Sequence, residues 1–169
     1  VVAAVVVVAL VCTWADRQRQ HAEFNALIAK AADAQSTARD AGSKVLSTRE
    51  YTMPLLVTSS SATVRTGLEQ LIDQSAAKGA VSLRKDRNAV AAVSVWPWHG
   101  SLRHAQRATL AYLDQRIADL DSVAAGGDLS ALNSTAAVAA SDQAVRALRS
   151  AASTTGEAAQ VIATFATSS

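Results

Sequence analysis

Three histidines, His21, His99 and His104, are the side chains of this 169-residue chain best suited to metal binding or proton transfer. His99 and His104 lie five residues apart, whereas two metal ligands on one helical face need a spacing of four. No Glu-x-x-His pattern occurs, which disfavours a di-iron carboxylate site. The spacing therefore favours structural or surface roles for the three histidines.

Nucleophile and phosphate-binding patterns are also missing from the sequence. There is no G-x-S-x-G, no G-x-x-x-x-G-K-[ST] and no G-x-G-x-x-G, and the single Cys12 lies within an apolar run. Asp114 and Asp121 share a helical face, and pairing with Arg107 or Arg116 would explain them without catalysis. We therefore expect a non-enzymatic protein with no cofactor, no metal and no small-molecule substrate.

The composition indicates long, closely packed helices. Half of the residues are apolar but only 4% are aromatic, so most apolar side chains are Ala and Val. The net charge is +2, which gives no reason to expect nucleic-acid binding. The densest basic group is Arg84, Lys85 and Arg87, and a solvated helix face is a better interpretation than a contact with anionic lipid.

The first fourteen residues, Val1 to Trp14, carry no charge. A helix of this length spans about 21 Å, against about 30 Å for the bilayer core, so we expect further apolar residues upstream of Val1. The run predicts a transmembrane anchor over residues 1–20, with Trp14 at the headgroups and polar residues from Asp16 onward. A cleaved signal peptide and a buried core helix are the alternatives.

A heptad pattern begins at Phe24 and predicts that the anchor helix continues without a break. It extends to about residue 48, and Pro54 is expected to stop the helix because the residue before a proline avoids the helical region. The two apolar positions of the heptad are occupied by Phe24, Ala31, Ala38 and Val45, and by Leu27, Ala34, Ala41 and Thr48.

Two further helices follow, each with an apolar stripe. The second begins after the Ser-rich residues 58–61, and Lys78-Gly79 predicts a break or a bend within it. The third ends at Gly126-Gly127. The stripes are Val64, Leu68, Leu71, Ile72 and Ser75 in the second helix, and Leu110, Leu113, Ile117, Leu120 and Ala124 in the third.

A short turn capped by Asp128 leads to a last helix capped by Ser134. Its expected seam repeats every seven residues, and a capping pattern predicts a join near Gly156. The seam positions are Val138, Val145, Ala152, Ala159 and Ala166, with Leu148 and Ile162 at the partner positions.

These helices predict an all-α protein, an antiparallel up-down-up-down four-helix bundle over residues 21–169. The turn between the second and third helices then lies at the membrane end, and all three tryptophans reach the headgroup level. The alternative is that Trp96 and Trp98 close the end of the core. The predicted membrane and partner interface is Trp14, Val90, Val93, Val95, Trp96, Pro97 and Trp98.

In layout and composition, the Val1–Trp14 anchor and the Ala/Val-rich helical remainder resemble single-pass membrane proteins of high-GC Gram-positive bacteria. Accessory subunits of respiratory supercomplexes have a similar layout. The resemblance implies a non-catalytic subunit in the cell membrane, docked on an integral membrane complex of the respiratory kind. We expect the bundle to be extracytoplasmic because the first segment looks like an uncleaved N-terminal signal anchor. The alternative is the sensory input module of a receptor, which would need a second membrane helix.

Overall fold

Four α-helices run alternately in opposite directions through the part of the chain that the computed structural model describes, residues 2–155. Side chains are described from Leu10 to Thr154. No strand occurs in this range, so the all-helical prediction and its up-down-up-down order are confirmed. The elements are α1 (Val2–Thr58), α2 (Ala62–Ala91), α3 (Gly100–Ala124), the 3-10 helix η1 (Leu129–Asn133) and α4 (Thr135–Thr155).

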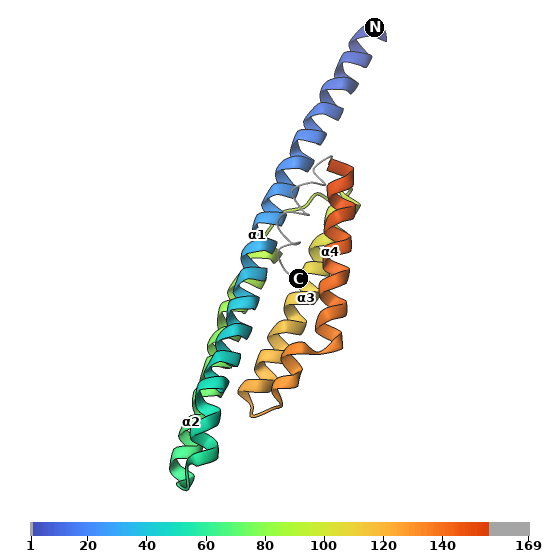
Figure 1. Ribbon diagram of the computed structural model, residues 1–169. Coiled ribbons are helices and arrows are strands. Elements are labelled where there is room, and N and C mark those ends of the chain that lie inside the picture. Colours follow the sequence, from blue (N-terminus) through green and yellow to red (C-terminus); the bar gives the residue numbers. More distant parts are fainter. Residues whose placement is uncertain (1, 156–169) are drawn as a thin grey trace.

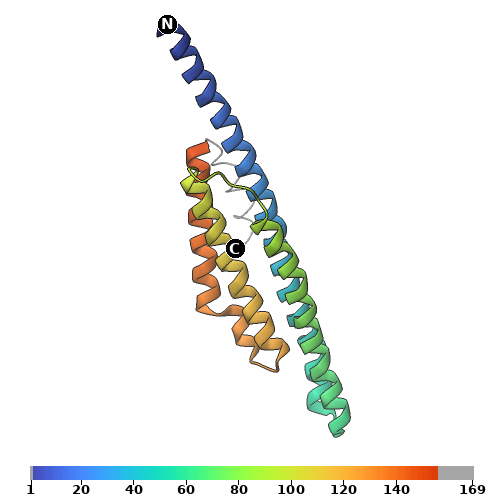
Figure 2. The same ribbon diagram turned by 180° about the vertical axis from the view of Figure 1, so that it is seen from behind.

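The helices are staggered along their axes. At one end the N-terminal part of α1 projects beyond the other helices, and at the opposite end the α1–α2 hairpin extends past the α3–α4 connection (Figures 1 and 2). Neighbours in sequence pack side by side, α1 on α2, α2 on α3 and α3 on α4. Among the described residues, no helix combines the length and the apolar character needed to cross a bilayer.

The heptad of α1 forms its buried seam, as the sequence predicts. Phe24, Ala31, Ala38 and Val45 are all buried, and so are three of the four partner positions. Small seam residues allow a close approach to α2, because a Cβ built on Gly79 would lie 2.8 Å from the Cβ of Ala41. Gly79 therefore serves a helix crossing, and α2 continues through Lys78-Gly79 with no break.

Pro54 does not stop α1, contrary to the sequence prediction. The helix continues to Thr58, four residues beyond the proline. Pro54 is exposed near the tip of the hairpin, where water can hydrate the carbonyl that loses its donor. The Thr58 hydroxyl donates to the Pro54 carbonyl at 2.8 Å and supports the last turn.

The stripe predicted for α2 is only partly correct. Val64 and Leu71 are about half exposed, because α3 does not extend far enough to cover this part of the hairpin. The buried positions lie further along, at Ala76, Ala80, Leu83 and Val90. The Ser61 hydroxyl accepts from the Val64 amide and caps the start of α2.

The prediction for α3 and the following turn is confirmed. Leu113, Ile117 and Leu120 are buried, and the helix ends at Ala124, just before Gly126, whose φ of 80° suits glycine. The Asp128 carboxylate accepts from the Ser130 amide at 3.1 Å and caps η1.

The seam predicted for α4 is correct at Leu148 and Ala152, which are fully buried, but its earlier positions are one residue out of register. Val138 is exposed and Val145 only partly buried, whereas Ala137, Ala144 and Ala151 are buried. The Ser134 cap is confirmed by the Ala137 amide at 3.1 Å. The predicted join near Gly156 and the seam positions Ala159, Ile162 and Ala166 lie outside the described residues.

Two members of the basic trio, Arg84 and Arg87, belong to the contact between α2 and α3. Arg84 pairs with Asp121, and Arg87 pairs with Asp114 at 2.9 Å. Both aspartates therefore pair across helices, and the expected pairing with Arg107 or Arg116 on their own helix is wrong. These ion pairs are partly or largely exposed, so each contributes little stability.

Candidate functional site: the junction at the base of the projecting helix

The connection between α2 and α3, residues 92–99, folds against α1 where the projecting part begins (Figure 2). Its contacts come from side chains far apart in the sequence, including His99 with Glu23 and Trp98 with Asp16. We call this cluster the junction. It comprises Asp16, Arg19, Glu23, Trp96, Trp98 and His99.

Glu23 is the buried acceptor at the centre of the junction, with 8% of its surface exposed. One carboxylate oxygen lies 2.6 Å from His99 Nδ1 and accepts from the Trp96 backbone amide at 3.2 Å. The other oxygen accepts from Arg19 Nε at 3.4 Å. A buried carboxylate is stable only with such donors, so Glu23 fixes the interhelical segment to α1.

His99 lies between two carboxylates and is 5% exposed. Its Nδ1 faces Glu23, and its Nε2 is 3.3 Å from Asp16 Oδ1. An ionised carboxylate only accepts hydrogen bonds, while a neutral imidazole carries one N–H. With both carboxylates ionised, both contacts are hydrogen bonds only when the ring carries two N–H groups. The ring thus lies between two acids, with one nitrogen facing each carboxylate.

Asp16 is the exposed member of this pair of acids. Its pKa is lowered from 3.8, first by the hydrogen bond from Trp98 and further by the hydrogen bond and positive charge of His99. The Trp98 indole donates to the same Asp16 oxygen at 3.1 Å. The ionised form of Asp16 is therefore the one that holds Trp98 against α1.

The two tryptophans of the segment contact each other and an arginine. Trp96 and Trp98 meet edge to face, with ring centroids 4.1 Å apart and planes at 80°. The Arg19 guanidinium lies 3.6 Å from the centre of the Trp96 ring. Arg19 therefore joins the aromatic pair to Glu23 through a cation–π contact and an ion pair.

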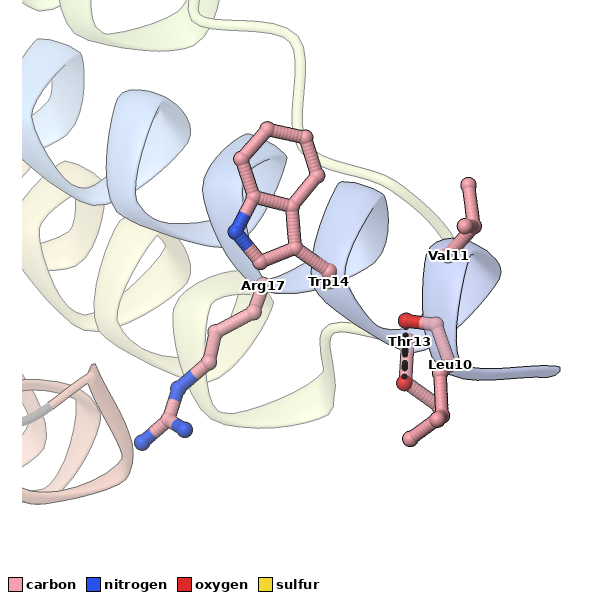
Figure 3. A pocket seen from close by; sticks show the side chains of 5 residues that line it. All are labelled: Leu10, Val11, Thr13, Trp14 and Arg17. Atoms are coloured by element: carbon pink, nitrogen blue, oxygen red, sulfur yellow. Dashed lines mark hydrogen bonds between the residues drawn. The ribbon is translucent and has the colours of Figure 1, made fainter. Parts of the chain in front are cut away.

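Beyond the junction, the projecting part of α1 presents an open, mostly apolar hollow (Figure 3). Leu10, Val11 and Trp14 are 63%, 58% and 65% exposed. The Thr13 hydroxyl donates to the Leu10 carbonyl at 2.9 Å, so it is satisfied within the helix. The hollow is lined by Leu10, Val11, Thr13, Trp14 and Arg17.

The predicted interface residues have different environments. Val90 belongs to the core and is fully buried, so its assignment to an interface is wrong. Val93 and Val95 are partly buried against the core, and Trp96 is partly buried. The exposed positions of the predicted set are Trp14, Pro97 and Trp98.

The sequence predictions missed the acids of the junction. Asp16 and Glu23 are seven residues apart, so they share one face of α1, and Glu23 directly precedes the buried Phe24. An acid in the heptad register beside a buried aromatic could have indicated a partner across the bundle. A structural or a surface role was expected for His99, and its burial and its contact with Glu23 indicate the structural role.

In residues 2–155, no three His, Cys, Asp or Glu side chains are placed to hold a metal ion. Comparison with known protein families, curated proteins and solved structures found no match.

Proposed function

We propose that this protein is a membrane-anchored, non-catalytic accessory subunit that docks on a larger integral membrane complex. One observation carries the proposal. The projecting part of α1 is uncovered by the other described helices and exposes Leu10, Val11 and Trp14. The sequence before Asp16 contains no charge. A patch this apolar seldom stays exposed to water on a soluble monomer.

The dimensions of α1 fit insertion of its end into a bilayer. From Val2 to Trp14 the helix spans roughly 20 Å, about two thirds of the hydrocarbon core. Asp16 and Arg17 then introduce the first charges. Trp14 lies within two turns of the α1 residues that contact Trp98 and Trp96, so all three rings gather at one level. Such a belt suits the boundary between headgroups and acyl chains.

The junction gives this anchor a fixed relation to the bundle. α1 is one uninterrupted helix from the projecting end into the core, so these two parts keep a fixed orientation relative to each other. Glu23 and His99 tie the interhelical segment to α1 just below the anchor. We propose that Pro97 and Trp98, exposed at this level, contact an integral membrane protein of the respiratory kind, with the bundle outside the cytoplasm.

Site-directed photo-crosslinking in native membranes tests the proposal. A photoreactive residue at Leu10 should form lipid adducts, and one at Trp98 should repeatedly capture the same integral membrane protein. The control position is Val57, which is 76% exposed at the opposite end of α1 and should give neither product. If Leu10 yields only adducts with soluble proteins or water, the proposal fails.

A sensory input module is the second candidate function, and the unbroken course of α1 favours it. A displacement of the projecting end would pass along one rigid helix to the hairpin tip. Spin labels at Leu10 and on α4 at Arg146 would measure that displacement. A distance that changes with a solute would support sensing, and a distance insensitive to any solute tested would favour the docking subunit.

A further inference from the structure

The end of the bundle from which α1 projects collects basic side chains. Ser101 at the start of α3 contacts Thr154 near the end of α4, with their hydroxyl oxygens 3.2 Å apart, so the start of α3 and the end of α4 lie together beside the junction. Six arginines lie within about 12 Å of this end along the helix axes. They are Arg17, Arg19, Arg103, Arg107, Arg146 and Arg149.

The acids in the same segments do not neutralise this charge. In residues 14–23, 96–107 and 146–155 the six arginines face only Asp16 and Glu23, a net of +4. Both acids contact His99. The whole chain has a net charge of +2, so the remaining residues carry −2 together. The far tip of the hairpin is balanced, with Arg49 and Arg65 against Glu50 and Glu69.

We propose that this basic end binds the anionic headgroups of the bilayer that the projecting part of α1 enters, an inference that rests on the proposed function. Arg17 and Arg19 lie on α1 and the other four arginines on α3 and α4, at the end of the bundle where Trp98 and Trp14 are exposed. Arg17 lies beside Trp14 on the projecting helix (Figure 3). Arginine next to exposed tryptophan is suited to the lipid interface, where the ring enters the headgroup layer and the guanidinium meets phosphate.

The exposed apolar helix decides between a lipid surface and other acidic partners. Headgroup attraction acts over about one Debye length, roughly 8–10 Å, so arginines one to two turns from the end still contribute. An acidic protein would be attracted by the same charge, but it offers no apolar phase for Leu10 and Val11. The exposed apolar helix and the surrounding arginines together match an anionic bilayer.

Vesicle flotation with the full chain tests this inference. The vesicles contain phosphatidylcholine alone, or phosphatidylcholine with part of it replaced by phosphatidylglycerol. We expect binding to both, with tighter binding to the anionic vesicles that weakens as salt is added. The variant Arg17→Gln/Arg149→Gln removes two exposed charges outside the junction. It should lose roughly fivefold in anionic-vesicle partitioning per arginine and nothing on neutral vesicles.

The matched control is Lys44→Gln/Lys78→Gln, which removes two exposed charges from the middle of the α1–α2 pair. Lys44 lies about 40 Å from Asp16 along α1, beyond the reach of headgroup attraction. Circular dichroism checks that both variants fold.

Equal losses of anionic-vesicle binding in the two variants would overturn the inference, because the total charge of the protein would then explain its preference for anionic vesicles. Equal binding of the parent chain to both vesicle types would overturn the inference and leave the proposed function standing. Binding to neither vesicle would remove the proposed function as well.

Discussion

His99 Nδ1 lies 2.6 Å from the Glu23 carboxylate, although 76 residues separate them in the chain. The contact joins the segment after α2 to α1, and it is buried on both sides. Asp16 lies about two turns before Glu23 on α1, and its carboxylate contacts the other ring nitrogen of His99. The base of the projecting helix is thus held by two of its own acids, on one helical face, and by one histidine from the α2–α3 connection.

Replacing Glu23 by Ala should destabilise the fold strongly. The change leaves His99 and the Trp96 amide buried without their acceptor, and breaking a buried ion pair costs about 3 kcal/mol. Urea denaturation measures the loss. The control Glu50→Ala alters an exposed acid of the same helix and should change stability by no more than about 0.5 kcal/mol. Similar values for the two variants would show that Glu23 bears no buried contact.

Two glycines of α2 should respond to alanine in opposite directions. Gly79→Ala places a methyl group 2.8 Å from Ala41 Cβ, and overpacking of about 1–3 kcal/mol exceeds a helix-propensity gain of about 1 kcal/mol. Gly67→Ala meets nothing within 4 Å, so it should stabilise by about 0.5–1 kcal/mol. Thermal unfolding of both variants decides the matter. Stabilisation by Gly79→Ala would contradict the close crossing of α1 and α2.

The pH dependence of stability should contain a contribution from Asp16 at acidic pH. Because the folded-state pKa is lowered below 3.8, the unfolded chain takes up the proton at higher pH than the folded chain. This stabilisation is complete above the unfolded pKa and disappears as the pH falls through the folded one. Asp16→Asn should therefore flatten the decline in unfolding free energy below about pH 4.

Urea midpoints measured from neutral to acidic pH provide the test for Asp16. Asp128 is a useful comparison, because its pKa is also lowered, chiefly by the Ser130 backbone amide. Asp128→Asn should remove a separate part of the acid slope, additive with the first because the two sites are far apart. An unchanged acid slope in Asp16→Asn would refute the assigned role of the Trp98 and His99 contacts.

Local periodicity was sufficient to predict much of the bundle. Phe24 and its heptad successors determine the buried face of α1, because period and burial are properties of one helix. The first half of the α4 seam was wrong because Ala137 and Val138 are both small and apolar, so the pattern could not choose between adjacent registers. The prediction for Pro54 was wrong for a related reason. Exposure at the hairpin tip reduces the cost of a proline within the helix, and this exposure depends on where the other helices end.

The junction was harder to predict than the helices. Placing the connection between α2 and α3 at the end where α1 projects follows from helix order alone, and this prediction is confirmed. Pairing His99 with Glu23 needs the rotation of each helix about its axis as well. The partner of Asp114 was mispredicted for the same reason. An arginine on its own helix was a plausible partner from the sequence, but in the structure Asp114 pairs with Arg87 of α2.

Trp14 should contribute to membrane binding without contributing to the fold. It is 65% exposed on the projecting part of α1, so Trp14→Ser should leave the unfolding midpoint nearly unchanged. On phosphatidylcholine vesicles the variant should bind several-fold more weakly, because the ring no longer enters the headgroup layer. The matched control is Tyr51→Ser, which removes an aromatic ring that is 78% exposed near the other end of α1. Flotation with both variants separates the two ends of the helix. If Tyr51→Ser reduces binding as much as Trp14→Ser does, the projecting end has no special role at the membrane.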